Sequence, residues 1–393
     1  MPYSLYLIPY TLSLLPFALN LYFCQMKYFL IFLLFPIMMQ AQNNYMLVGT
    51  YTDNSPSKGI YVYRFNTATG VAEEVSHVAS PNPSYLAVSP DERFVYAIYE
   101  NAAGGNGGEI ASFSFNKNDG TLQLLNKLPT KGDHPCYVET DRTGRWVFAG
   151  NYTSGSLSMF PVKADGSLDS ATVHITHEGS GPDKKRQASP HVHCTKISPD
   201  NKFLYVADLG VDKIYAYAFD ATKGSLQPAA QPYVSVMPGE GPRHITFDSK
   251  GRFAYLLTEM TSKIHTYSYQ NGKLTAVQTT QGLPQEGNGG SAAIHLSPDG
   301  KFLYASHRIK YVGLVIYRVG KDGKLTKVGY MPSGGEAPRD FTIDPSGNFL
   351  LTGNQGSNNI AVFRRNASTG LLTDTGKRIE VGKPVCFKWI SGK

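Results

Sequence analysis

The sequence predicts an all-β protein, a seven-bladed β-propeller with four antiparallel strands in each blade. Three observations support this fold class. A unit of about 50 residues recurs along the chain. The composition, with 39 Gly, 24 Pro, 25 Tyr and 20 Phe among 393 residues, is typical of short aromatic strands joined by tight turns. No stretch after Gln42 has the periodicity of an amphipathic helix.

The recurring unit is centred on a turn that is followed by a basic residue or Asn and then by an aromatic residue. A later turn contains Gly and, two positions on, Leu, and leads into a fourth strand. The pairs of a basic residue or Asn with the following aromatic residue are Arg93-Phe94, Arg145-Trp146, Lys202-Phe203, Arg252-Phe253, Lys301-Phe302 and Asn348-Phe349. Successive pairs are 47 to 57 residues apart. The later glycines are Gly120, Gly166, Gly224, Gly272, Gly323 and Gly370.

The two ends of this repeat predict the seventh blade. Residues 382–390 resemble an innermost strand with no partner strand after it, whereas residues 45–50 and 60–65 resemble later strands with no innermost strand before them. Joining them closes the ring and removes both open sheet edges. We therefore expect one propeller domain over residues 43–393, with the N- and C-terminal strands sharing a blade.

The first 42 residues predict a targeting segment. Read from Met26, the chain has a basic start at Lys27, an apolar run over residues 28–39 and a small residue, Ala41, near the cleavage point, as a secretory signal has. The apolar run over residues 5–23 is long enough to be a membrane anchor, which is the alternative. We favour cleaved export, giving a periplasmic or secreted protein with no membrane span in the mature chain.

Charge and cysteine usage narrow the function. The net charge is +7, but Lys and Arg are scattered rather than clustered, so we expect no nucleic-acid partner and interpret the excess as suited to a small anionic substrate. No CxxC motif occurs, and Cys136, Cys194 and Cys386 lie inside apolar strand patterns, which predicts buried free thiols. We expect a monomer with no metal ion and no cofactor.

Hairpin topology predicts where polar side chains gather. In each blade the start of the first strand and the end of the second lie at the same face, opposite the connecting turn. Because nine residues separate Pro242 from Gly251 and eight separate Gly251 from Glu259, Arg243 and Glu259 should meet near the central channel. The same argument brings polar residues from every blade to that face: Ser84, Glu100, His134, Asn151, His191, His193, Asp208, Arg308, Arg339 and Asn354. Arg339 has an alternative role, a local ion pair with Asp340.

Several motifs at these positions resemble one known family. They are residues 48–52 (Val-Gly-Thr-Tyr-Thr), Arg186-Gln187 with Pro190, His191 and His193, residues 208–212 (Asp-Leu-Gly-Val-Asp), residues 241–244 (Gly-Pro-Arg-His) with Glu259, and Asn354-Gln355. The chain, from about Tyr45 to Ile390, resembles the lactonase family of seven-bladed propellers, whose members include bacterial 6-phosphogluconolactonase and fungal carboxy-muconate cyclase. The Pro-His-x-His and Gly-Pro-Arg-His motifs are the more specific part of the match.

The resemblance implies a metal-independent lactonase that hydrolyses a sugar lactone at the central channel. Candidates for the acid or base are His191, His193 and Glu259, and Arg243 and Arg308 can bind an oxyanion, carboxylate or phosphate. We expect substrate-binding roles for Tyr51, Asn151, Arg186, Gln187, His244 and Gln355. Replacing Arg243 or Glu259 by Ala should lower turnover by about 10²-fold or more.

Two departures leave the substrate open. Similar proteins usually carry Asn where this chain has His307, directly before Arg308, and the expected export separates the protein from phosphorylated cytoplasmic sugars. Three alternative functions remain: a carboxy-muconate-type lactonising cyclase, a metal-dependent sugar lactonase, and a non-catalytic propeller that binds protein or another ligand.

Overall fold

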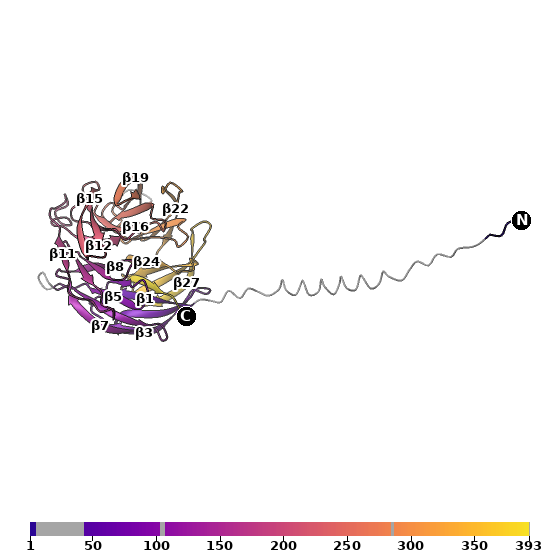
Figure 1. Ribbon diagram of the computed structural model, residues 1–393, viewed down its shortest axis with the longest axis horizontal. Helices are drawn as coiled ribbons and strands as arrows, with labels where there is room; N and C mark the ends of the chain where they lie inside the picture. The colour runs from indigo at the N-terminus through magenta and orange to yellow at the C-terminus, as the bar shows by residue number, and fades with distance from the viewer. Residues whose placement is uncertain (5–42, 103–106, 284–286, 393) are drawn as a thin grey trace. The chain divides into compact units, whose positions relative to one another are not determined.

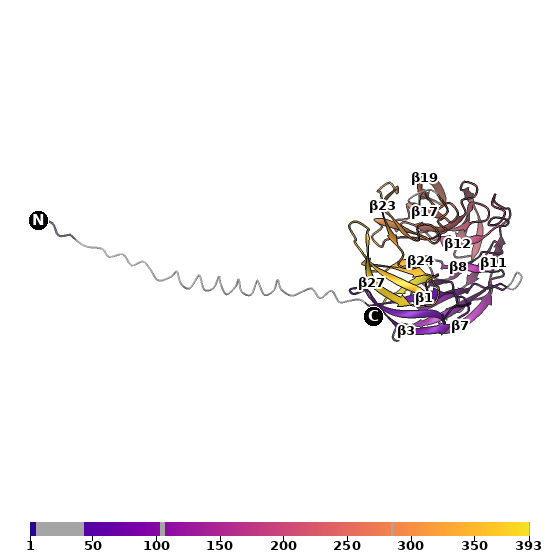
Figure 2. The ribbon, with the colours of Figure 1, turned by 180° about the vertical axis from the view of Figure 1, so that it is seen from behind.

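The computed structural model describes residues 1–4, 43–102, 107–283 and 287–392, and in these ranges the chain forms strands and turns but no helix. The strands build seven four-stranded antiparallel sheets, which confirms the predicted fold class. The sheets follow one another around a ring in chain order, from indigo β1 to yellow β27 (Figure 1), and the view from behind shows the same succession (Figure 2).

Six blades are continuous in sequence, with the first strand innermost. Blade 2 contains β4 (Tyr85–Val88), β5 (Phe94–Tyr99), β6 (Glu109–Asn116) and β7 (Thr121–Pro129); blade 3 contains β8 (Pro135–Thr140), β9 (Trp146–Asn151), β10 (Ser156–Pro161) and β11 (Val173–Thr176); blade 4 contains β12 (Val192–Ile197), β13 (Phe203–Asp208), β14 (Lys213–Asp220) and β15 (Ser225–Ser235). Blade 5 contains β16 (Pro242–Phe247), β17 (Phe253–Thr258), β18 (Lys263–Gln270) and β19 (Lys273–Gln281); blade 6 contains β20 (Ser291–Leu296), β21 (Phe302–His307), β22 (Gly313–Val319) and β23 (Leu325–Pro332); blade 7 contains β24 (Pro338–Ile343), β25 (Phe349–Asn354), β26 (Asn359–Arg365) and β27 (Leu372–Glu380).

Blade 1 is assembled from both ends of the ring. The innermost strand β28 (Pro384–Ile390) pairs with β1 (Asn43–Thr50), which is followed by β2 (Gly59–Asn66) and β3 (Val71–Ala79). The β1–β28 register aligns Tyr45 with Ile390 and Val48 with Phe387. This closure is the one that the sequence predicted, and it leaves no innermost strand of the ring without a partner among the described residues.

Contacts between adjacent blades explain the two conserved halves of the repeat unit. The glycine in the turn before each fourth strand lies against the aromatic residue that begins the second strand of the preceding blade, so a Cβ at Gly272 would stand 2.3 Å from Phe203. The glycine also has a positive φ, +79° at Gly272, which other residues rarely adopt. A tyrosine two residues beyond the aromatic donates its hydroxyl to the same glycine carbonyl, as Tyr205 does to Gly272 at 2.8 Å. The same contacts recur with Tyr96, Tyr255 and Tyr304.

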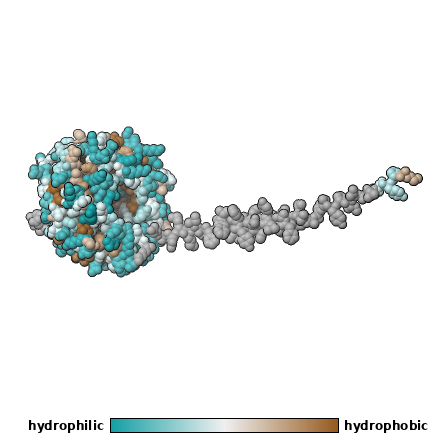
Figure 3. All heavy atoms as spheres, in the orientation of Figure 1, coloured by the Kyte–Doolittle hydropathy of each residue, from teal (hydrophilic) through white to brown (hydrophobic). Residues whose placement is uncertain are grey.

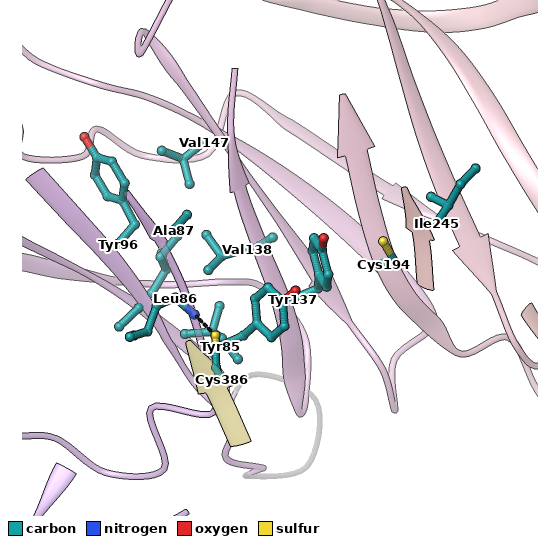
Figure 4. Packing of buried hydrophobic residues seen from close by; sticks show 14 of the residues in the cluster. Tyr85, Leu86, Ala87, Tyr96, Tyr137, Val138, Val147, Cys194, Ile245 and Cys386 are labelled. Carbon is teal, nitrogen blue, oxygen red and sulfur yellow. Dashed lines mark hydrogen bonds between the residues drawn. The ribbon is translucent and has the colours of Figure 1, made fainter. Parts of the chain in front are cut away.

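The hydrophobic core fills the spaces between blades, and one such space joins blade 1 to blades 2 and 3. Figure 4 shows Tyr85 of β4 beside Tyr137 of β8, and Cys386 of β28 accepting the backbone N–H of Leu86. The two tyrosine rings are stacked with centroids 4.2 Å apart. Outside this core, the face seen in Figure 3 is mostly hydrophilic with scattered hydrophobic residues.

The predicted targeting segment lies almost wholly outside the described residues, because residues 5–42 are not among them. No helix in the described part of the chain is long and apolar enough to cross a membrane. The cysteine prediction is confirmed: Cys136, Cys194 and Cys386 are free and buried.

Candidate functional site

A β-bulge near the start of the innermost strand turns one side chain of several blades toward the channel. In blade 5, Pro242 pairs with Thr258 and His244 with Leu257, so the residue between them, Arg243, has no partner on β17. A bulge of this kind re-aims the side chain of the extra residue. The same register break occurs at equivalent positions in blades 3, 4, 7 and 1, where it isolates Cys136, His193, Arg339 and Val385.

A second set of side chains comes from the residue that follows the second strand. Its backbone N–H donates to a carbonyl just before the innermost strand, as Glu259 does to Gly241 at 2.8 Å and Glu100 to Asn82 at 3.0 Å. This turn brings both hairpin ends to one level, as the strand lengths suggested. The residues in this position are Tyr51, Glu100, Tyr152, Leu209, Glu259, Arg308 and Gln355.

Together the two sets form a pair of connected cavities. The inner cavity has a volume of about 220 Å³ and is lined by Glu100, Cys136, Tyr152, Arg186, His193, Glu259, Arg308 and Arg339. The outer one, of about 600 Å³, shares Arg186, Glu259 and Arg308 with it. The remaining residues around the outer cavity are partly polar and partly small or apolar: Asn288, Gly290, Ile309, Ala337, Gln355, Gly356, Asn358 and Lys383.

Glu259 is bound by three arginines. Its Oε1 accepts from Arg186 at 2.6 Å, and its Oε2 accepts from Arg243 Nε at 2.9 Å and lies 3.1 Å from Arg308. Burial opposes ionisation of Glu259, but the charges of Arg308 and Arg243 outweigh it and hold the pKa of this carboxyl well below its usual range. Both oxygens are therefore engaged, and Glu259 orients the arginines around it.

Arg243 lies behind the wall of the inner cavity, where its charge acts on Glu259. Its side chain is 1% exposed and lines neither cavity. Besides Glu259 it donates to the carbonyl of Ala292 and lies 3.3 Å from His244 Nε2. The arginines that face the inner cavity are Arg186, Arg308 and Arg339.

A second carboxylate, Glu100, comes from blade 2. Its Oε2 accepts the hydroxyl of Tyr51 at 2.7 Å and that of Ser84, while Arg339 lies 4.0 Å away and covers the ring of Tyr51. The alternative of a local Arg339–Asp340 pair is wrong, because Asp340 instead accepts His295 Nε2 at 2.9 Å and the backbone N–H of Phe387.

The three histidines predicted at the channel, His191, His193 and His244, lie in different environments. His193 lines the inner cavity, with Nδ1 3.7 Å from Cys136 Sγ, and burial together with the charge of Arg243 holds its pKa well below the usual range. His191 lines neither cavity: its Nδ1 lies 3.0 Å from the carbonyl oxygen of Tyr152, and its ring is stacked on that tyrosine. His244 lies one residue beyond the bulge and packs edge-on against Tyr137.

A cluster of aromatic rings packs next to His193, which lines the inner cavity. Tyr85, Tyr137 and His244 contact one another in this cluster, with ring centroids 4.2 to 6.0 Å apart. His193 also touches His244, with centroids 5.3 Å apart. Rings from four different blades therefore pack together in this cluster.

Of the predicted substrate-binding residues, four line neither cavity: Tyr51, Asn151, Gln187 and His244. Asn151 is fully buried and donates to Ser156 Oγ at 3.0 Å and to the carbonyl of Thr130. Gln187, also fully buried, donates to the carbonyl of Leu209 at 2.8 Å and to Asp212 at 2.9 Å. Both bind neighbouring chain segments together, whereas Tyr51 contacts the Glu100 carboxylate, and Arg186 and Gln355 line cavities as expected.

Some cavity residues were not among the predicted site residues. Glu100 and Arg339 were noted at strand ends but not selected, Tyr152 was passed over in favour of its neighbour Asn151, and Cys136 was interpreted only as a buried thiol. Aligning the blades residue by residue identifies them, because Glu100 and Tyr152 stand where Glu259 does, and Cys136 and Arg339 where Arg243 does. Among the described residues, no group of three or more His, Cys, Asp or Glu is arranged to hold a metal ion.

The fold and the site define the class of the protein: a seven-bladed propeller with a cavity that is lined by arginines, glutamates and other polar groups from several blades. The chain belongs to the family described as Lactonase, 7-bladed beta-propeller, whose model matches residues 45–389. This confirms the resemblance seen in the motifs.

Individual relatives extend the match along the whole propeller. A 6-phosphogluconolactonase of Formosa agariphila is 40% identical over 334 residues, covering 83% of this chain and 94% of that protein. A 6-phosphogluconolactonase of Bacillus subtilis is 34% identical over 349 residues, covering 87% and 97%. The solved structure of a periplasmic gluconolactonase of Pseudomonas aeruginosa is 36% identical with a TM-score of 0.85, covering 89% of this chain and all of that one.

Proposed function

We propose that the protein hydrolyses a sugar lactone in the inner cavity without a metal ion. The observation that carries this proposal is the charge of the cluster. The cluster contains four arginines (Arg186, Arg243, Arg308 and Arg339) and two glutamates (Glu100 and Glu259). Four positive and two negative charges leave two positive charges uncompensated around a buried cavity. A lactone becomes an oxyanion when water adds to its carbonyl and a carboxylate when its ring opens, and fixed positive groups stabilise both.

The arginines that face the cavity are the groups to bind this developing charge. Arg308 is largely buried, and although burial lowers its pKa to about 10, the residue is charged at neutral pH. Arg186 and Arg308 are held in place by Glu259, so they need not reorganise when charge develops. Neutral His193 offers a hydrogen bond within the same cavity.

Charge and the relatives' names bear on which lactone the site takes. The positive surplus and the relatives' names favour 6-phosphoglucono-δ-lactone, whereas the periplasmic relative favours the unphosphorylated ring. We also propose, from the signal-like sequence and this same relative, that the protein works outside the cytoplasm.

The test is a lactone panel assayed with the purified protein. Acid release from glucono-δ-lactone and 6-phosphoglucono-δ-lactone, followed with a pH indicator, should exceed spontaneous hydrolysis and should be unchanged after treatment with EDTA. The Arg308→Ala variant should lose about 10²-fold or more in kcat/KM, because one buried donor to the oxyanion is removed. Activity that disappears with EDTA would contradict the metal-independent mechanism, and no activity on any lactone would contradict the function.

A further inference from the structure

Lactone hydrolysis needs a group that takes a proton from water as it attacks, and the predicted acceptors are poorly placed for this. Glu259 has both oxygens bound by arginines, which stabilise its charge and weaken it as a base. His193 is surrounded by buried groups and the charge of Arg243, so a second positive charge on its ring is unfavourable. His191 lies outside both cavities.

The carboxylate of Glu100 has fewer contacts with arginine than that of Glu259. Glu100 lines the inner cavity, and every hydrogen bond or ion pair that its carboxylate makes with the described residues involves Oε2. Oε1 receives no bond from any of them. Its one arginine neighbour, Arg339, is 4.0 Å away, compared with the direct contacts of 2.6 to 3.1 Å that three arginines make with Glu259.

The groups around Glu100 fix the carboxylate without occupying its second oxygen. Tyr51 comes from blade 1, Ser84 from blade 2 and Arg339 from blade 7, so three blades hold the same carboxylate. Burial raises the pKa of Tyr51, which therefore stays a neutral hydroxyl and donates to Oε2. The carboxylate plane is thereby set, with Oε1 left to accept a hydrogen bond from water.

We propose that Glu100 is the general base of this site, with Oε1 as the atom that receives the proton; the inference rests on the proposed lactone hydrolysis. The water oxygen forms a bond to the lactone carbonyl carbon while its proton passes to Glu100. The resulting oxyanion lies among the cavity arginines. When it collapses, the bond from that carbon to the ring oxygen breaks, the ring oxygen takes the proton back from Glu100, and the product is a hydroxy acid.

The experiment compares Glu100 variants on whichever panel lactone the wild type opens fastest. Glu100→Gln keeps the shape and the Tyr51 contact but cannot take the proton, so kcat should fall about 10²-fold or more with little change in KM. The kcat of Glu100→Ala should decrease by a similar factor. Added formate, a small carboxylate that fits the space left by the removed side chain, should partly restore it. Glu109→Gln is the matched control, because Glu109 is a partly exposed glutamate of the same blade that pairs with Lys127 and lines neither cavity; this variant should behave as wild type.

The outcomes separate this inference from the function it rests on. A wild type that opens no lactone overturns both. An active wild type together with a fully active Glu100→Gln variant overturns the inference alone. So does a loss in Glu100→Ala that formate does not relieve, because Glu100 would then only position Arg339. Thermal unfolding monitored by circular dichroism must show all variants folded; if Glu100→Gln loses activity only because it fails to fold, formate rescue of Glu100→Ala decides.

Discussion

At the scale of single residues, the last residue of the second strand and the one after it have different environments in several blades. Asn151, His307 and Asn354 occupy the last strand position and are fully buried between blades. The next residue faces the channel, as Tyr152 and Arg308 do. In these blades, one step along the chain therefore separates a residue that supports the blade from one that lines the candidate site.

His307 carries a pH dependence that its two asparagine counterparts lack. Burial lowers its pKa to about 4, from an ordinary value of about 6.5 in the unfolded chain. Between these values the unfolded chain binds a proton that the folded chain does not, so the free energy of unfolding decreases as pH falls from 6.5 to 4. The full effect of this residue is about 3 kcal/mol.

The His307→Asn variant should therefore lose less stability on acidification than the wild type. Asn suits the position because Asn151 and Asn354 fill its equivalents in blades 3 and 7. Urea denaturation at pH 7 and pH 5 measures the difference for both proteins. Equal losses in the two proteins would contradict the assignment of this acid sensitivity to His307.

Much of the candidate site follows from sequence, and the residues that it left out have physical reasons. Arg243 and Glu259 could be placed together because strand lengths alone bring hairpin ends to one level. Hairpin geometry did not separate Asn151 from Tyr152, because both lie at the level where the second strand ends; the structure buries Asn151 and places Tyr152 on the inner cavity. A single sequence does not reveal where a bulge falls, so Cys136 was interpreted as an ordinary strand residue.

At the scale of strands and turns, the packing of one turn glycine against the neighbouring aromatic determines how blades stack. Gly272 meets Phe203, and Gly370 meets Phe302, in the same way. These residues belong to the two motifs from which the repeat was recognised. The strand order could be predicted from sequence because the motifs mark the turns, whereas the contact that makes them necessary needed the three-dimensional arrangement.

Gly272→Ala should destabilise the protein more than a glycine change in an open turn. Its methyl group would stand 2.3 Å from Phe203 in a backbone with φ +79°, which combines overpacking of about 1–3 kcal/mol with backbone strain. Gly300→Ala is the matched control, since its φ is +65° but nothing lies within 4 Å. Guanidinium denaturation should show the larger loss for Gly272→Ala, and equal losses would mean that strain alone matters.

At the scale of the whole molecule, the ring depends on a single closure between distant parts of the chain. β28 is the innermost strand of blade 1 and also packs beside β4 and β24 of the adjoining blades. Without it, the hydrogen-bonding edge of β1 would be exposed, together with buried residues such as Leu47 and Val48. An open, apolar strand edge favours aggregation.

A chain ended after Gly382 should therefore fail to form a stable monomer. It lacks only β28 and the few residues beyond it, but it loses the pairing that completes blade 1. A chain ended after Ser391 retains β28 and is the control. Size-exclusion chromatography and circular dichroism should show aggregation for the first and a folded monomer for the second. A monomeric, cooperatively unfolding product of the shorter chain would show that the closure is dispensable.

The shared blade also sets an order of events during protein synthesis. Because β28 is translated after the other twenty-seven strands, β1 emerges from the ribosome long before its inner partner exists. Six blades can assemble while the chain is still being made, since each is continuous in sequence. Blade 1 is completed only at the end of translation. The same holds for the pocket wall that Tyr51 of blade 1 and Arg339 of blade 7 build where these two blades meet. A nascent chain would thus have most of its β-structure but no complete binding site.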